Sequence, residues 1–277
     1  MEKELLIKRL LEYSIDNNLS HIPSALSMLH YTHELFRHDD SEAVIDPYSW
    51  NIVIGKPFGA QAYYIIWHYY YMLNIDDLSY GVKHNEIDFV DYGEETLGNA
   101  LGFASGISYN GKRTYCNISD GALQMGPTLE AIQFIGKHKQ NIVLTVDYNR
   151  TQLTGNTTDI LGMTINGVYD TFYNAGWLPY IISDSKFNAK NIKSILDNSK
   201  GPIVFLIETN KGSGIDEMVQ DPVKWHYKQL RNMNEITLSK SWKDNNYWRW
   251  NSWAFKCTVS YSKISKYWNY MDISRRK

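Results

Sequence analysis

Two polar side chains each follow a run of apolar, strand-like residues. Asp120 comes after the run 114–118, and Asn149 comes after the run 142–146, 29 positions beyond Asp120. In a parallel α/β unit, the carboxyl ends of consecutive strands open on the same edge of the sheet, where ligands bind. A carboxylate and an amide oxygen at that edge are hard ligands that suit Mg²⁺ held against a diphosphate.

The residue after Asp120 is Gly121, which would let the backbone come close to a diphosphate. An Asp-Gly pair alone is more typical of a turn. Asn149, at the expected distance and directly after a strand-like run, favours the ligand-binding interpretation. The sequence therefore predicts a magnesium and diphosphate site between residues 119 and 149.

The elements that would position these residues alternate along the chain. Strand-like runs at 114–118, 142–146 and 202–207 are separated by helical segments, including 122–140 and 188–197. This alternation predicts a mostly parallel sheet covered by helices on both faces, a three-layer αβα fold of the α/β class. Helices are also predicted over 2–17, 24–36 and 59–73. The last is rich in aromatic residues and is interpreted as a buried or interface helix.

Composition excludes several classes of protein. The 277 residues carry a net charge of −2, which gives no general signal for nucleic acid or an acidic membrane surface. Two cysteines, Cys116 and Cys257, exclude a disulfide scaffold and a cysteine zinc site. The N-terminus lacks the apolar stretch of a signal peptide, and no apolar run approaches the length of a membrane span. We expect a cytoplasmic protein with no nucleic-acid or membrane partner.

The last part of the chain differs in character, so we predict a domain over 1–233 and an extension over 234–277. The extension mixes five tryptophans with many lysines and arginines and keeps neither helical nor strand periodicity. Aromatic and basic residues together can bind single-stranded nucleic acid. Packing on the chain's own domain or on a partner is the favoured interpretation, and a tail without selected structure is the third alternative.

From residue 12 to about residue 230, the chain resembles the N-terminal, diphosphate-binding half of transketolases, especially forms split into two polypeptides. Five segments in the family's order support the resemblance, which makes it more specific than any one motif. They are 20–27 (Ser-His-Ile-Pro-Ser-Ala-Leu-Ser), 96–102 (Thr-Leu-Gly-Asn-Ala-Leu-Gly), 120–131 (from Asp-Gly to Glu-Ala), Asn149 with 153–155 (Leu-Thr-Gly), and 211–214 (Lys-Gly-Ser-Gly) with Trp225-His226.

The resemblance implies a thiamine diphosphate-binding fold with thiamine diphosphate and Mg²⁺ as cofactors. By resemblance, Asp120, Asn149 and the backbone carbonyl of Thr151 would bind the metal. The cofactor-binding residues implied are these three together with Leu97, Gly98 and Gly121. By the same resemblance, His21 and His226 would be the catalytic residues of the substrate channel, where imidazoles can bond sugar hydroxyls and move protons.

Four residues, in three segments, depart from the family pattern. Phe58 stands where transketolases have a histidine that faces the substrate, and Glu94-Glu95 replace a usual Thr-Gly pair. Met125 replaces an acid that, in the family, lies near the subunit contact. We therefore expect an intact cofactor site beside a substrate site of altered specificity.

The resemblance also implies a partner. The 51 residues that follow Trp225-His226 are too few for the pyrimidine-binding domain whose glutamate activates the cofactor. We expect one subunit of a two-component transketolase-like transferase that moves a two-carbon ketol unit between sugars. The C-terminal type of subunit would supply the pyrimidine-binding domain, and a heterotetramer is expected. The alternatives are another thiamine diphosphate reaction, such as 2-oxo acid decarboxylation or acyl transfer to an unusual sugar, and a non-catalytic scaffold subunit.

Overall fold

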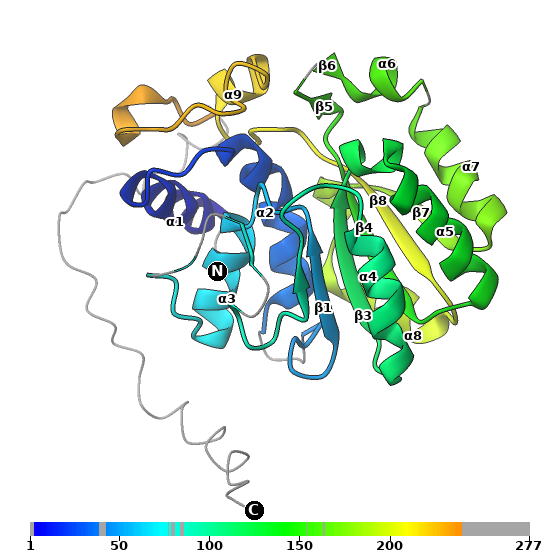
Figure 1. The fold of residues 1–277 in the computed structure, drawn as a ribbon. Coiled ribbons are helices and arrows are strands. Elements are labelled where there is room, and N and C mark those ends of the chain that lie inside the picture. The colour runs from blue at the N-terminus through cyan, green and yellow to red at the C-terminus, as the bar shows by residue number, and fades with distance from the viewer. Residues whose placement is uncertain are drawn as a thin grey trace, which may run out of the picture. The chain divides into compact units, whose positions relative to one another are not determined.

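A six-stranded sheet with all neighbouring strands parallel forms the centre of the fold (Figure 1). The computed structural model describes residues 3–38, 43–76, 78, 81–83, 86–153, 155–162 and 164–239, which fall within one compact unit. The strand order is β2-β1-β3-β4-β8-β7. The strands are β1 (Asn51–Gly55), β2 (Tyr92–Gly93), β3 (Thr114–Ser119), β4 (Ile142–Tyr148), β7 (Leu178–Ser183) and β8 (Ile203–Glu208), with β5 (Thr151–Gln152) and β6 (Gly155–Asn156) paired antiparallel outside this sheet.

Helices cover both faces of the sheet and give two hydrophobic cores. One core joins the sheet to α1 (Lys3–Asp16), α2 (Ile22–Phe36), α3 (Gln61–Tyr71) and α8 (Ala189–Asn198). The other joins it to α4 (Ala100–Ile107), α5 (Gly126–His138) and α7 (Ile165–Ala175). Successive side chains of β1 alternate between the cores, with Ile52 and Ile54 in the first and Val53 in the second, as a pleated strand requires. The predicted three-layer α/β fold is confirmed.

The observed elements differ from the predicted ones in several places. The segment 122–140 is not one helix, because a short 3₁₀ helix, η2 (Asp120–Gln124), precedes α5. Met125 between them has extended backbone, and a proline follows in the first turn of α5, a position where its missing N–H costs nothing. Strands β1 and β7 and helix α7 are additional to the elements predicted from the sequence. Two short helices, α6 (Thr157–Leu161) and α9 (Asp216–Gln220), complete the order.

The first turns of α3 confirm the interpretation of the aromatic segment as a buried helix. Tyr63, Tyr64 and Trp67 are buried in the core, whereas Tyr69 in the last turn is exposed. The Tyr63 hydroxyl meets the Tyr115 hydroxyl of β3 at 2.8 Å. These side chains therefore anchor α3 on the sheet.

The start of the predicted extension packs against α9. Ile215 and Leu238 form an isolated antiparallel bridge, and the Ser239 hydroxyl donates to Asp216 Oδ1 at 2.6 Å. Residues 240–277 lie outside the described residues, so the domain boundary at 233/234 stays a prediction.

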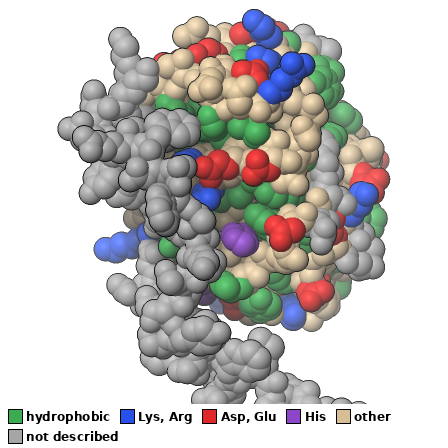
Figure 2. Space-filling view, turned by 90° about the vertical axis from the view of Figure 1, so that its left-hand side faces the viewer, with side chains coloured by type: hydrophobic (Ala, Val, Ile, Leu, Met, Phe, Trp, Pro, Cys, Tyr) green, Lys and Arg blue, Asp and Glu red, His purple; other side chains and the backbone are tan. Residues whose placement is uncertain are grey.

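The described surface is mixed in character. On the face in Figure 2, hydrophobic, acidic and basic side chains are interspersed, and its described part carries no continuous basic stripe. The described helices are all too short or too polar to cross a membrane.

Candidate functional site

The register of the central strands brings Asp120 and Asn149 to one edge of the sheet. Ser119 at the end of β3 is the pairing partner of Asp147 in β4, and Tyr148 is the partner of Glu208 in β8. The chain therefore leaves β3 and β4 side by side, with Asp120 opening η2 and Asn149 directly following β4. This is the arrangement that the sequence predicted.

Asp120 is a buried carboxylate with one oxygen in use. Its Oδ2 accepts hydrogen bonds from the Arg150 backbone N–H at 2.9 Å and from the Thr157 hydroxyl at 2.8 Å. Arg150 adopts the left-handed region at φ 63°, which costs about 1–3 kcal/mol outside glycine. Burial raises the pKa of Asp120 to about 6, and the nearby Asp147 charge acts in the same direction. A cation at Oδ1 would oppose both effects.

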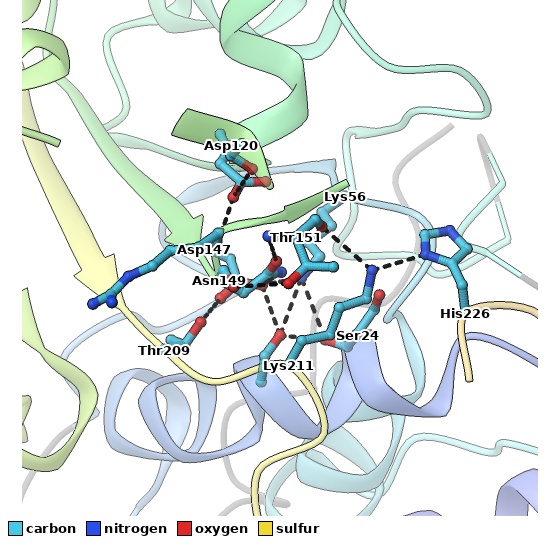
Figure 3. Close-up of polar contacts among 12 residues, drawn as sticks. Ser24, Lys56, Asp120, Asp147, Asn149, Thr151, Thr209, Lys211 and His226 are labelled. Carbon is cyan, nitrogen blue, oxygen red and sulfur yellow. Dashed lines mark hydrogen bonds and ion pairs between the residues drawn. The ribbon is translucent and has the colours of Figure 1, made fainter. Parts of the chain in front are cut away.

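Asn149 is fixed at both ends of its side chain. Its Oδ1 accepts a hydrogen bond from the Thr151 backbone N–H at 3.0 Å, and its Nδ2 donates to Asp147 Oδ2 at 2.9 Å. Asp147 is completely buried. Although burial alone would raise the pKa of Asp147, the Lys56 ammonium and the hydrogen bonds hold it below its ordinary value. We call Ser27, Lys56, Asp147, Asn149 and Thr209 the Asp147 network (Figure 3).

Lys211 lies beside the third predicted metal ligand. Its Nζ donates to the Thr151 carbonyl at 3.4 Å and lies 2.8 Å from His226 Nδ1 (Figure 3). No carboxylate of the described residues forms an ion pair with it. Burial, with the charge of Lys56, lowers the pKa of Lys211 to about 8. A buried ammonium without a counter-ion is a favourable partner for an anion.

The two predicted catalytic histidines lie together in a group of rings. His21 stacks on Phe58, with ring centroids 4.5 Å apart, and meets His226 and Tyr227 edge-on at 4.8 Å each. We call these four residues the histidine cluster. Burial lowers the pKa of His21 to about 3 and that of His226 to about 4, and neighbouring positive charges add to the effect. Near neutral pH both imidazoles are therefore uncharged and can donate and accept hydrogen bonds.

The predicted cofactor-binding residues Leu97, Gly98 and Gly121 have different surroundings. A Cβ placed on Gly121 would be 3.8 Å from Leu97 Cδ1. Gly98 has φ 121°, and a Cβ there would lie 2.9 Å from the Met125 side chain. Glycine is therefore required at 98 by the protein itself. At 121 the fold leaves room for a side chain, so any need for glycine there comes from a ligand.

The departures at 94 and 95 have different environments. Glu94 is buried, and its carboxylate accepts hydrogen bonds from the backbone N–H groups of Asn99 and Ala100 at the start of α4. Burial raises the pKa of Glu94, and these hydrogen bonds act against that rise. Glu95 is exposed. Glu94 thus serves as a cap for α4.

The donor set fits a hard divalent cation next to an anion. The described residues contain no group of three His, Cys, Asp or Glu side chains arranged for a metal, so one carboxylate with amide and carbonyl oxygens is the available set, which suits Mg²⁺. Around Gly121, the buried Ser119 Oγ and Gln152 Nε2 have no hydrogen-bond partner among the described residues. A diphosphate could accept from both.

Sequence reasoning missed three functional candidates. Lys211 was recognised as part of the Lys-Gly-Ser-Gly motif but not as a site residue, and its motif was the available signal. Lys56 lies in the segment 55–58 and Asp147 lies two residues before Asn149, but their contact carried no signal in the sequence, because they lie 91 positions apart and meet only through the fold.

Known proteins similar in sequence are transketolases and related enzymes, although no family model matches the chain. Human transketolase is 28% identical over 214 residues, covering 70% of this chain and 34% of the relative. The 1-deoxy-D-xylulose-5-phosphate synthase of Blochmanniella floridana is 26% identical over 174 residues, covering 52% and 28%. One of the subunits of the apulose-4-phosphate transketolase of Phocaeicola vulgatus is 25% identical over 151 residues, covering 51% and 53%. The chain spans about a third of the length of the full transketolases it matches.

Solved structures similar to this fold are transketolases. The enzyme from Campylobacter jejuni superposes with a TM-score of 0.59 at 21% identity, covering 79% of this chain and 39% of that one. A Pichia stipitis transketolase variant gives 0.63 at 17% identity, covering 76% and 36%. The fold is the thiamine diphosphate-binding fold predicted from the sequence, and the chain is a relative of the transketolases, with one component of a split transketolase among its homologues.

Proposed function

We propose that this chain is the diphosphate-binding subunit of a two-component, Mg²⁺- and thiamine diphosphate-dependent transketolase-like enzyme. The enzyme would cleave a C–C bond next to a ketone and pass the two-carbon ketol unit to an aldehyde sugar. The observation that carries the proposal is the buried Asp120 carboxylate, joined through residues 149–151 to the buried Lys211 ammonium, which forms no ion pair with the described carboxylates. One position there suits a divalent cation, and the next suits an anion.

Each residue then has a role in binding. Asp120 Oδ1, Asn149 Oδ1 and the Thr151 carbonyl would hold Mg²⁺, and that carbonyl would exchange its hydrogen bond from Lys211 for the metal. Lys211 would turn to the diphosphate and compensate its charge. Leu97, Gly98 and Gly121 would border the cofactor. When bound, thiamine diphosphate supplies the carbanion-stabilising chemistry.

The histidine cluster would handle the sugar. His21 and His226, both uncharged, would bond its hydroxyls and move protons during bond cleavage and formation. Neutral imidazoles are suited to this task because each offers one donor and one acceptor nitrogen.

A partner subunit is part of the proposal. The similarity to a protein that is one component of a transketolase made of separate subunits supports a split enzyme. We infer that a second polypeptide with a pyrimidine-binding domain completes the site, with two copies of each subunit in a heterotetramer. We also propose that the enzyme is cytoplasmic.

Calorimetry of the chain mixed with its partner subunit tests the proposal. Thiamine diphosphate binding should require Mg²⁺ and should be abolished by Asp120→Ala, because the substitution removes the only carboxylate of the proposed donor set. The control is Asp159→Ala, since Asp159 is exposed on α6. Unchanged, Mg²⁺-dependent binding in Asp120→Ala would contradict the proposed site.

A second candidate within the same cofactor class is favoured by Phe58. Its ring stacks on His21 and offers the substrate no hydrogen bond. A different substrate, either a 2-oxo acid or an unusual sugar that accepts an acyl group, would suit a substrate site lined by this apolar ring. Assays of the reconstituted pair with ketose phosphates against 2-oxo acids would separate the two. A complex of the pair that shows no bound cofactor when Mg²⁺ and thiamine diphosphate are supplied would instead identify a non-catalytic scaffold subunit.

A further inference from the structure

The Asn149 side chain has one end that can bind a metal and one that cannot. Its carbonyl oxygen accepts a cation, whereas its NH₂ group carries two donor hydrogens that repel one. A half-turn of the amide exchanges the two ends without changing the shape of the side chain. The site therefore needs a device that sets the orientation of this amide.

Asp147 meets that need from a fully buried position. Its Oδ2 receives the Asn149 Nδ2–H at 2.9 Å and the Ser27 hydroxyl at 2.7 Å, and its Oδ1 receives the Thr209 hydroxyl. An ionised carboxylate accepts hydrogen bonds and donates none. The turned amide would place Asn149 Oδ1 against Asp147 Oδ2, two acceptors with no hydrogen between them, in a buried place where such a contact is costly.

Lys56 stabilises the ionised form of the buried Asp147 carboxylate. Its Nζ forms an ion pair with Asp147 Oδ2 and also donates to the Ser24 carbonyl and the Ser27 hydroxyl at 3.3 Å each. Figure 3 shows Ser24, Asp147 and Asn149 gathered on this side of the site. The residues come from α2, the ends of β1 and β4, and the segment after β8, so the orientation is imposed by the whole sheet edge.

We propose that Asp147, held in place by Lys56, is a positioning residue that turns the Asn149 amide so that its oxygen faces the metal. The inference rests on the proposed function, because it takes Asn149 as a metal ligand. In this arrangement neither Lys56 nor Asp147 would be a metal ligand. Removing such an outer partner typically weakens metal binding by about 10- to 100-fold.

The test measures Mn²⁺ binding by electron paramagnetic resonance, with thiamine diphosphate and the partner subunit present. The variant Lys56→Met/Asp147→Leu removes both charges together and so leaves no unpaired buried charge. We expect its Mn²⁺ dissociation constant to rise at least tenfold. The matched control is Lys8→Met/Glu12→Leu, a surface ion pair of 3.6 Å, which should leave it unchanged. An unchanged constant in the first variant would overturn the inference.

A rescue variant distinguishes an effect on the orientation of the Asn149 amide from a general effect on the stability of the fold. Asn149→Asp has an oxygen at each end, so a half-turn no longer matters. Added to Lys56→Met/Asp147→Leu, it should restore Mn²⁺ binding to within about threefold of the wild type, the difference expected from residual packing changes. Failure of that rescue in a folded protein would overturn the inference. Absence of Mn²⁺ binding in the wild type would instead contradict the proposed function.

A measurement on the wild-type chain covers the case in which the variants do not fold. The Asn149 NH₂ protons, assigned by their loss in Asn149→Asp, should exchange slowly with solvent in nuclear magnetic resonance because they are bonded to buried Asp147. Exchange at the rate of an exposed asparagine, such as Asn198, would overturn the inference.

Discussion

The Asp147 network and the histidine cluster lie at the same edge of the fold but are held in different ways. In the network, a buried carboxylate receives hydrogen bonds from three other side chains and an ion pair from a fourth. In the histidine cluster, the four rings contact one another by packing, hydrogen-bonding contacts reach His21 from Ser20 and His226 from Lys211, and Tyr227 is exposed. Directional bonds in a buried place fix one arrangement, whereas ring contacts are less directional. We therefore expect the proposed metal site to tolerate few substitutions, and the proposed substrate site to tolerate replacement of one ring by another.

The largest expected effect that tests this contrast comes from Lys56→Met. The change leaves the Asp147 carboxylate buried without its cation, which costs about 3–5 kcal/mol in the free energy of unfolding. Chemical denaturation monitored by circular dichroism measures it. The control Lys8→Met breaks an exposed pair and should cost under about 1 kcal/mol. Equal losses of unfolding free energy in Lys56→Met and Lys8→Met would show that the Asp147 network is no more constrained than a surface ion pair.

The next effect is a pH dependence of the proposed metal binding. Because the pKa of Asp120 is raised to about 6 from its ordinary 3.8, the folded metal-free chain holds this proton more tightly than the unfolded chain does. Its stability should therefore fall as pH rises from about 4 to 6. Mg²⁺ must displace the proton, so affinity should weaken about tenfold per pH unit below 6. Calorimetric titrations at pH 5, 6 and 7 measure the slope, and pH-independent affinity would count against Asp120 as a ligand.

A smaller effect is expected from Phe58→His in the histidine cluster. The new ring keeps the stack on His21 and adds a hydrogen-bonding nitrogen, worth about 1 kcal/mol or roughly fivefold in KM for a hydroxylated ketose. Steady-state kinetics with the partner subunit measure it, and Phe58→Tyr is the matched ring control. A protein destabilised as strongly as Lys56→Met would show that the cluster is as strict as the network.

The smallest effect is expected at the exposed ring. Tyr227→Leu loses the edge contacts with His21 and His226, each pair worth about 0.5–1.5 kcal/mol when well packed. Since Tyr227 is 58% exposed, we expect less than about 1 kcal/mol in denaturation. Tyr227→Phe, which keeps the ring, should be neutral.

The sequence predicted the fold class and the two residues that follow β3 and β4. Both strands are fully buried, and the strand-like runs 114–118 and 142–146 located their ends in the sequence. Strand β1 has five residues and β7 begins with an exposed Leu178, and short runs of this kind are not distinguished by periodicity. The single helix expected over 122–140 was wrong in its first turn, because extended Met125 separates η2 from α5.

The network could not be predicted because its members are single polar residues far apart in the chain. Lys56 and Asp147 meet through the register of β1, β3 and β4, which no local pattern encodes. The depressed pKa values of both histidines likewise follow from burial and from Lys211, which approaches from the segment after β8. The roles of all the predicted site residues stay predictions: His21, Leu97, Gly98, Asp120, Gly121, Asn149, Thr151 and His226.

The position of the Asp147 network within the strand order has a consequence for how the molecule opens. Its members lie in β4, directly after β1, β4 or β8, or on α2, and these strands are interior in the order, whereas β2 and β7 are its edges. Fraying of an edge strand therefore leaves the network assembled. Amide hydrogens of residues 147–149 should exchange through unfolding of the whole domain, and a bound ligand should slow the exchange of every core strand by the same factor.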